Sequence, residues 1–178
     1  MKLTDKWSSL TFFNEDEEHS QKIAVRLSGI EGRGGAGLQA DKRYYVYDFW
    51  NDRLIGIFKG SDVLEQELRK GEARQMLSVK MESNPQVLST DRHLLQGLLE
   101  LSEVSWNEET KELAGYAELV AGEPMRIAIA SNGWNPQSCS VSDAEVKCSS
   151  EKNSEDIVKL SLESARGGKV FWKFSFKK

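Results

Sequence analysis

The sequence predicts an all-β protein made of two antiparallel β-sandwich domains in tandem, with Greek-key or jelly-roll-like connections. Short segments in which apolar and polar residues alternate recur along the whole chain. Turn residues separate these segments about every 8 to 12 positions, a spacing typical of sandwiches. The polar stretch of residues 82–85 ends in a proline and marks a boundary, so the two domains are expected over residues 1–83 and 84–178.

The most easily predicted strand covers residues 44–50, with the sequence YYVYDFW. Tyr, Val, Phe and Trp favour the pleated, half-buried surface of a sheet. Asn51 and Asp52 follow as a turn signal, and residues 54–58 supply a hairpin partner. We expect the rings to pack in a core and Asp48 to be a structural polar residue.

The first half of the chain carries six segments with a period of two, and each predicts a strand. Their ranges are residues 6–13, 22–28, 43–50, 53–59, 63–68 and 73–80. In the second of them, Ile23, Val25 and Leu27 share one face, as expected where one side of an antiparallel sheet packs on a core. A helix over residues 62–74 is the competing interpretation, and glycines near both ends favour a short strand instead.

The second half predicts seven further strands. Their ranges are residues 95–106, 111–119, 124–130, 138–142, 145–149, 157–164 and 169–176. Turn residues separate them, including an Asn-Gly pair at residues 132–133. The closing strand has aromatic residues on both faces, which predicts a central position in a sandwich.

Composition excludes several classes of partner. The 178 residues are 39% hydrophobic and 29% charged, with a net charge of −4. A nucleic-acid surface would normally appear as a basic patch or stripe, and none is evident. No apolar run approaches the roughly 20 residues of a membrane helix. We therefore expect neither a nucleic-acid partner nor a membrane partner.

The chain contains two cysteines, Cys139 and Cys148. If residues 143–144 form a two-residue hairpin loop, the cysteines face each other on adjacent strands, and a cross-strand disulfide is geometrically allowed. Such bridges need a specific Cβ geometry, so two small buried thiols are the alternative. The compartment stays open.

Three features of the sequence resemble functional motifs, but none of them indicates a catalytic site or a cofactor site. Residues 32–37, GRGGAG, match the letters of a dinucleotide-binding loop, but a strand follows where that loop must open a helix. His19 and His93 each lack a neighbour at metal-ligand spacing, so no metal site is expected. Asp91, Arg92 and His93 are adjacent in sequence, which does not suit a catalytic triad, and they are expected to form a polar junction between the halves.

Three aromatic residues of the second half are candidate sugar-binding residues: Trp106, Tyr116 and Trp134. Flat rings match the apolar face of a pyranose, whereas core packing is the ordinary role of such rings in a sandwich. The chain also has 28 carboxylates. Most of them lie in turns or charged runs, which argues against the facing pair that glycoside hydrolysis needs.

Two segments resemble the C-terminal β-domain of alpha-galactosidase-like (melibiase) glycoside hydrolases. Residues 44–51, followed by Leu-Ile-Gly at 54–56, resemble the YVYDFWN strand and LG turn of that family. Residues 85–97, PQVLSTDRHLLQG, resemble its PQLLSTDRHLSQG segment. Glu72 resembles the glutamate of a PHEA step, although Lys-Gly replaces Pro-His before it. The likeness covers roughly residues 7–134.

The resemblance implies a supporting role. In such enzymes the catalytic aspartates lie on a preceding (β/α)8 barrel of about 250 residues, and nothing here resembles that barrel. No catalytic residue is carried over, and the chain is not expected to be an enzyme. The expected role is a non-catalytic C-terminal accessory region of a larger glycoside hydrolase, with the barrel of the parent chain as its partner. The alternative is a carbohydrate-binding module that uses Trp106, Tyr116 or Trp134, and a free-standing enzyme is the third.

Overall fold

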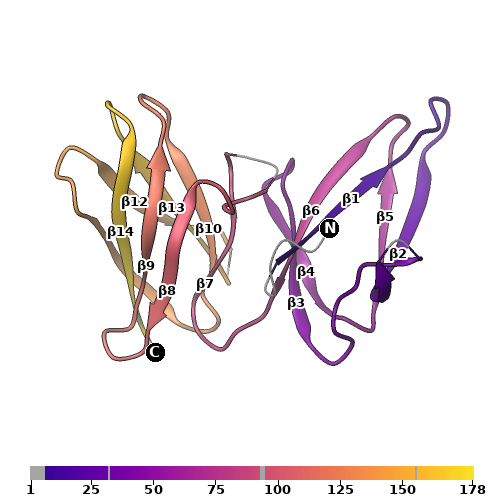
Figure 1. Cartoon of the computed structure of the whole chain (residues 1–178), viewed down its shortest axis with the longest axis horizontal. Coiled ribbons are helices and arrows are strands. Elements are labelled where there is room, and N and C mark those ends of the chain that lie inside the picture. Colours follow the sequence, from indigo (N-terminus) through magenta and orange to yellow (C-terminus); the bar gives the residue numbers. More distant parts are fainter. Residues whose placement is uncertain (1–6, 32, 93–94, 155) are drawn as a thin grey trace. The chain divides into compact units, whose positions relative to one another are not determined.

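The structure is a computed structural model that describes residues 7–31, 33–92, 95–154 and 156–178. The described residues form fourteen strands and no helix (Figure 1). The chain divides into two compact units, residues 1–81 and 82–178. The architecture is therefore all-β, with antiparallel sheets that pack as sandwiches, as the alternating pattern predicts.

The first unit contains a four-stranded and a two-stranded sheet. Its strands are β1 (Trp7–Phe13), β2 (Gln21–Glu31), β3 (Arg43–Asp48), β4 (Arg53–Lys59), β5 (Val63–Leu68) and β6 (Ala73–Lys80). Sheet A has the order β1-β6-β3-β4, and sheet B pairs β2 with β5. All of these pairings are antiparallel. The core of the unit combines residues from both sheets, among them Leu27, Tyr44, Val46, Leu64 and Met76.

Close backbone approaches explain two glycines of the first unit. The chain folds back on β2 after residue 31, and Ala36 and Leu38 donate main-chain hydrogen bonds to β2 carbonyls at 3.0 and 2.9 Å. A Cβ on Gly35 would lie 2.4 Å from the Ser28 carbonyl oxygen. A Cβ on Gly60 would lie 2.0 Å from the carbonyl oxygen of residue 39. The described part of the glycine-rich segment is thus a fold-back against a strand.

The second unit is a sandwich of two four-stranded sheets. Its strands are β7 (Gln86–Thr90), β8 (Leu101–Asn107), β9 (Glu112–Leu119), β10 (Met125–Ala130), β11 (Asn135–Val141), β12 (Lys147–Lys152), β13 (Ile157–Glu163) and β14 (Gly168–Lys177). Sheet C has the order β12-β13-β10-β7, and sheet D has the order β11-β14-β9-β8. The β8–β9 hairpin of sheet D separates β7 from its partner β10 in sheet C, which gives a Greek-key connection.

Alternation along each strand builds the core of this sandwich. In sheet C, Met125, Ile127 and Ile129 of β10 pair with apolar residues of β13 and are fully buried. In sheet D, Trp172 and Phe174 of β14 are fully buried. β14 lies between β9 and β11, so the prediction of a central closing strand is confirmed.

Most predicted segments correspond to strands of the structure, and the bounds of β2, β11 and β12 differ from the predicted ones by up to three residues. β3 ends at Asp48, two residues earlier than expected, because residues 49–52 form the turn. β7 was not predicted, since its residues were assigned to the boundary and to the family-like segment. The strand expected over residues 95–106 is wrong in its first half: Gln96 and Gly97 have φ of 53° and 113°, and β8 begins at Leu101. Among the residues described, none forms a helix with the length and apolar character needed to cross a membrane.

Candidate functional site

A shallow polar hollow of about 290 Å³ lies on sheet C. Three strands contribute its lining: β10, β12 and β13. The lining residues are all polar or charged: Arg126, Ser149, Ser150, Glu151, Lys159 and Ser161. Because core residues alternate with them along β10 and β13, the hollow belongs to the outer face of the sheet.

The strand register arranges five of these residues in two cross-strand rows. Ser149 lies opposite Ser161, which in turn lies opposite Arg126. Two positions further along, Glu151 lies opposite Lys159. Residues on the same face that are diagonal neighbours across an antiparallel pair lie about 7–8 Å apart at their backbones. We call these five residues the frame. They provide two cationic groups, one carboxylate and two hydroxyl groups: Arg126, Lys159, Glu151, Ser149 and Ser161.

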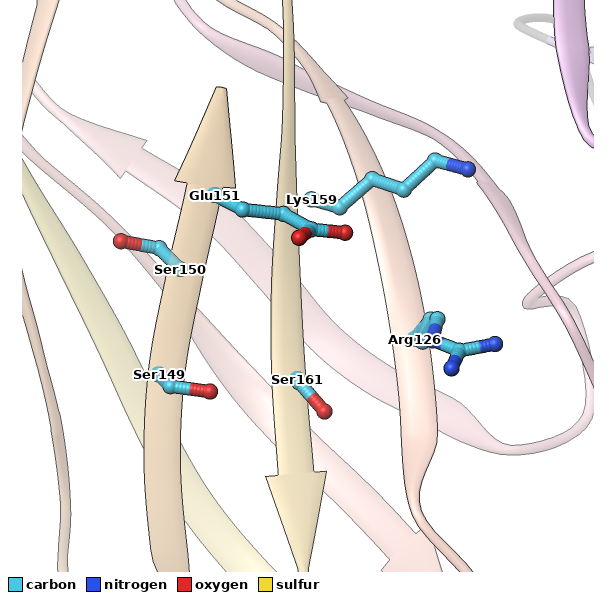
Figure 2. A pocket seen from close by; sticks show the side chains of 6 residues that line it. All are labelled: Arg126, Ser149, Ser150, Glu151, Lys159 and Ser161. Carbon is cyan, nitrogen blue, oxygen red and sulfur yellow. The ribbon is translucent and has the colours of Figure 1, made fainter. Parts of the chain in front are cut away.

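The side chains of this frame differ in direction and in burial. Figure 2 shows the Arg126 and Lys159 side chains extending in the same direction, while Ser150 points away from the others. Lys159 is only 8% exposed, whereas Arg126 is exposed. Within the described part of the chain, the structure gives the Arg126 guanidinium no protein partner; its main-chain N–H donates to Asp91 Oδ1 at 2.9 Å.

Trp106 and Trp134 lie together, with ring centroids 5.1 Å apart in an edge-to-face arrangement. Trp134 is 8% exposed and donates its indole N–H to the Ser83 carbonyl oxygen at 3.3 Å. The ammonium groups of Lys111 and Lys178 lie 5.3 and 5.5 Å from its ring centroid. Trp106 also contacts the ring of a β14 residue, Phe176. Trp134 is therefore packed within the end of the sandwich, and Trp106 beside it is half-buried.

Tyr116 belongs to a different cluster. It lies opposite Phe171 on sheet D, with ring centroids 5.2 Å apart and planes at 60°. Both rings are half-buried and alternate with core residues, so they occupy the outer face of the sheet. The Lys169 ammonium lies 4.6 Å from the Tyr116 centroid. The structure thus brings together two of the three predicted sugar-binding residues and keeps the third apart.

The two cysteines are free thiols on neighbouring edges of the two sheets. The expected hairpin is wrong: β11 pairs with β14 and β12 pairs with β13, and residues 142–146 cross from one sheet to the other. Burial raises the pKa of the Cys148 thiol, and a hydrogen bond with Cys139 raises it further. Both thiols are half-buried, and the Cys148 thiol remains protonated at neutral pH.

The family-like segment at residues 85–97 is bonded into the second unit. Ser89 donates to Gln96 Oε1 at 2.9 Å, and Thr90 donates to the carboxylate of Glu100. The Asp91 main chain and side chain both bond to the main chain of Arg126. Arg92 binds the side chain and the carbonyl oxygen of Glu123, each at 2.6 Å.

The hydrogen bonds of Asp91 and Arg92 can be compared with the prediction that Asp91, Arg92 and His93 form a polar junction between the two halves of the chain. They all join residues of the second unit. His93, the remaining member of the Asp-Arg-His triplet, lies outside the described residues.

Asp48, in the other family-like segment, is fully buried at the start of the β3–β4 turn. Its carboxylate accepts hydrogen bonds from the Asn51 side chain at 2.7 Å and from the Asn51 main chain at 3.3 Å. The Nε atoms of Arg53 and Arg74 each lie 3.9 Å from Oδ2. The carboxylate therefore fixes the turn that follows the aromatic strand, and Asp48 is a structural polar residue as expected.

Several surface carboxylates have structural partners that stabilise their charged form. A main-chain N–H bond from Arg69, followed by bonds from Arg74, lowers the pKa of Glu72. The Lys111 ammonium lowers the pKa of Glu108, and the Lys173 ammonium lowers that of Glu112. A general acid of a glycoside hydrolase requires a raised pKa, so these three groups are suited to ion pairs.

His19 is partnered by an exposed carboxylate, since its Nδ1 lies 3.3 Å from Asp16 Oδ2. Asp16 also accepts main-chain hydrogen bonds from Glu18 and His19, which lower its pKa. Within the described ranges, the structure contains no cluster of three or more His, Cys, Asp or Glu side chains placed to hold a metal ion. The run of acidic residues at 15–18 therefore forms part of a turn.

The hollow on sheet C was not predicted from the sequence. Its residues alternate with core residues along β10 and β13, and this alternation is the signal that the sequence carries for them, whereas β12 has no buried residue. Comparisons of the chain with protein-family models and with curated proteins find no match.

Proposed function

We propose that this chain is a non-catalytic accessory region of a larger alpha-galactosidase-like glycoside hydrolase, in which it supports the catalytic (β/α)8 barrel. The proposal begins from the likeness of residues 44–51 and 85–97 to the C-terminal β-domain of that family. The observation that carries it is where these residues lie. Asp48 fixes a turn, and Ser89, Thr90 and Arg92 bond to neighbouring parts of their own unit.

The architecture fits a supporting role. Two antiparallel sandwiches provide rigid, well-packed bodies, and function in glycoside hydrolases of this type is located on the barrel. Trp50 is 61% exposed and packs edge-to-face on Phe49 beside the turn that Asp48 fixes. An indole held in this way is suited to contact a second body, because exposed aromatic rings are enriched in protein interfaces.

The test uses the coding sequence upstream of this chain. We expect it to encode a (β/α)8 barrel, and we expect the barrel expressed with residues 1–178 to have a higher melting temperature than the barrel alone. The isolated chain is expected to give no turnover of an aryl alpha-galactoside. Turnover by the chain alone, or a barrel equally stable without the chain, would contradict the proposal.

A carbohydrate-binding module is the second candidate, and the Tyr116–Phe171 pair favours it. This pair keeps aromatic surface on the outer face of sheet D, whereas Trp134 is packed inside. Titration with a panel of neutral oligosaccharides, monitored by calorimetry, tests it. Binding that Tyr116→Ala abolishes would support this function, and flat titrations across the panel would eliminate it.

A further inference from the structure

We infer that the hollow on sheet C binds a sugar residue that carries a carboxylate, a uronic acid, with Arg126 as the carboxylate-binding residue. This inference concerns different residues from the Tyr116 pair and does not depend on the barrel. Failure of either one therefore leaves the other in place.

Arg126 indicates that the ligand carries a negatively charged group. Its guanidinium is exposed, and the part of the chain that the structure describes provides it with no partner. A guanidinium presents parallel N–H donors that match the two oxygens of a carboxylate. Arg126 also lies beside Ser161 in the register, so a hydroxyl group is available next to the bound carboxylate.

Glu151 indicates that the ligand also carries several hydroxyl groups. A carboxylate in the frame repels phosphate or sulfate, yet it is a strong acceptor for the hydroxyl groups of a sugar. Lys159, opposite Glu151, is 8% exposed, so the donors that the hollow presents come from Arg126 and the serine hydroxyl groups. A surface with both hydrogen-bond donors and acceptors suits a ligand that also has both. A simple inorganic anion does not have both.

The size and composition of the hollow further limit which ligands can bind there. Its volume of about 290 Å³ is just below the range of about 300–1,000 Å³ for ligand pockets, so one sugar ring fits it better than a nucleotide. The described lining has no aromatic ring for stacking on a neutral sugar. In the adjoining row, Lys147 and Glu163 lie 3.5 Å apart and form an ion pair of their own.

The first experiment is an NMR titration of the ¹⁵N-labelled chain with the methyl glycoside of galacturonic acid. We expect shifts confined to β10, β12 and β13, with a dissociation constant of about 1 mM, the scale for one sugar ring. The methyl glycoside of galactose, which lacks the carboxylate, is expected to bind at least about tenfold more weakly because no charged group meets the guanidinium. Equal affinity for the two glycosides, or no shifts with either, would overturn the inference.

Variants separate a sugar site from a simple anion site. Arg126→Gln should weaken galacturonoside binding by about tenfold or more and leave the melting temperature unchanged. The matched control is Arg166→Gln, since Arg166 is an exposed arginine paired with Glu145 at 3.0 Å, and it should leave binding unchanged. Unchanged binding by the Arg126 variant would overturn the assignment.

Glu151→Gln gives the sharpest contrast. If Glu151 accepts sugar hydroxyl groups, the variant binds the galacturonoside more weakly. If the hollow binds only anions, removing a negative charge strengthens binding of both the galacturonoside and inorganic sulfate. Tighter galacturonoside binding by this variant, or sulfate binding to the wild-type chain as tight as that of the galacturonoside, would overturn the inference.

Discussion

Replacement of Asp48 by alanine is the perturbation that most directly tests the structural account of the aromatic strand. The carboxylate is fully buried and accepts two hydrogen bonds from Asn51, at 2.7 and 3.3 Å. Hydrogen bonds to a charged group contribute about 1.5–3 kcal/mol each, and the longer one belongs at or below the low end. The two guanidinium groups at 3.9 Å add less, because Arg53 is 59% exposed and Arg74 keeps its bonds to other residues. We expect a loss of about 3–4 kcal/mol in the free energy of unfolding.

Urea unfolding monitored by circular dichroism measures this loss. With a slope of about 2 kcal/mol per molar urea, the transition of the first unit should move to lower urea by about 1.5–2 M. Asp48→Asn keeps the shape of the side chain and one acceptor, so a smaller loss of about 1–2 kcal/mol is expected. Asp41→Ala is the control, since Asp41 is an exposed residue paired with the exposed Lys42, and its effect should stay within about 0.5 kcal/mol. An Asp48→Ala shift no larger than that of the control would refute the role assigned to the buried carboxylate.

Three further predictions concern stability and thiol reactivity. Gly60→Ala should cost about 3 kcal/mol in urea unfolding, because the new Cβ would lie 2.0 Å from the Gln39 carbonyl oxygen, whereas Gly71→Ala, with a φ of 63° and open space, should cost about 1 kcal/mol; equal costs would contradict the clash. The lowered pKa of Glu72 gives stability that is present above its ordinary value of 4.5 and is lost as pH falls, so Glu72→Gln should flatten the decline in melting temperature below that pH; an unaltered slope would argue against it. The raised pKa of Cys148 should make its alkylation by iodoacetamide at pH 8 at least about tenfold slower in the folded chain than in urea, as followed by peptide mass spectrometry, and equal rates would contradict its burial.

The sequence predicted most strands because local periodicity and turn chemistry agree with the tertiary structure. The bounds of β4, β5 and β6 match the predicted segments, since turn residues flank each of them in the sequence. β7 was missed because residues 86–90 are buried along their whole length and show no alternation. A strand of this kind depends on neighbours that are distant in the sequence, which no local pattern reveals.

The functional surfaces were harder to predict because they depend on which strands are neighbours. Arg126 and Ser161 are 35 positions apart in the sequence, and only the β10–β13 register places them opposite each other. The hairpin on which a Cys139–Cys148 bridge depended is absent for the same reason: the short separation of the cysteines suggested a hairpin, whereas the chain crosses between two sheets. The three candidate aromatic residues were found by type alone, and the alternation on β9 could have indicated that Tyr116 faces away from the core.

The position of β14 sets the order in which the second unit can be completed during synthesis. Residues 168–177 emerge after every other strand of this unit, yet they form the middle of sheet D and provide pairing partners for both β9 and β11. Until then, the β8–β9 hairpin presents Leu113, Ala117 and Leu119 without the strand that covers their flank. A nascent chain therefore carries an unfinished apolar sheet for as long as its translation is incomplete, and any pause before residue 168 prolongs the exposure of a pairing edge to other chains.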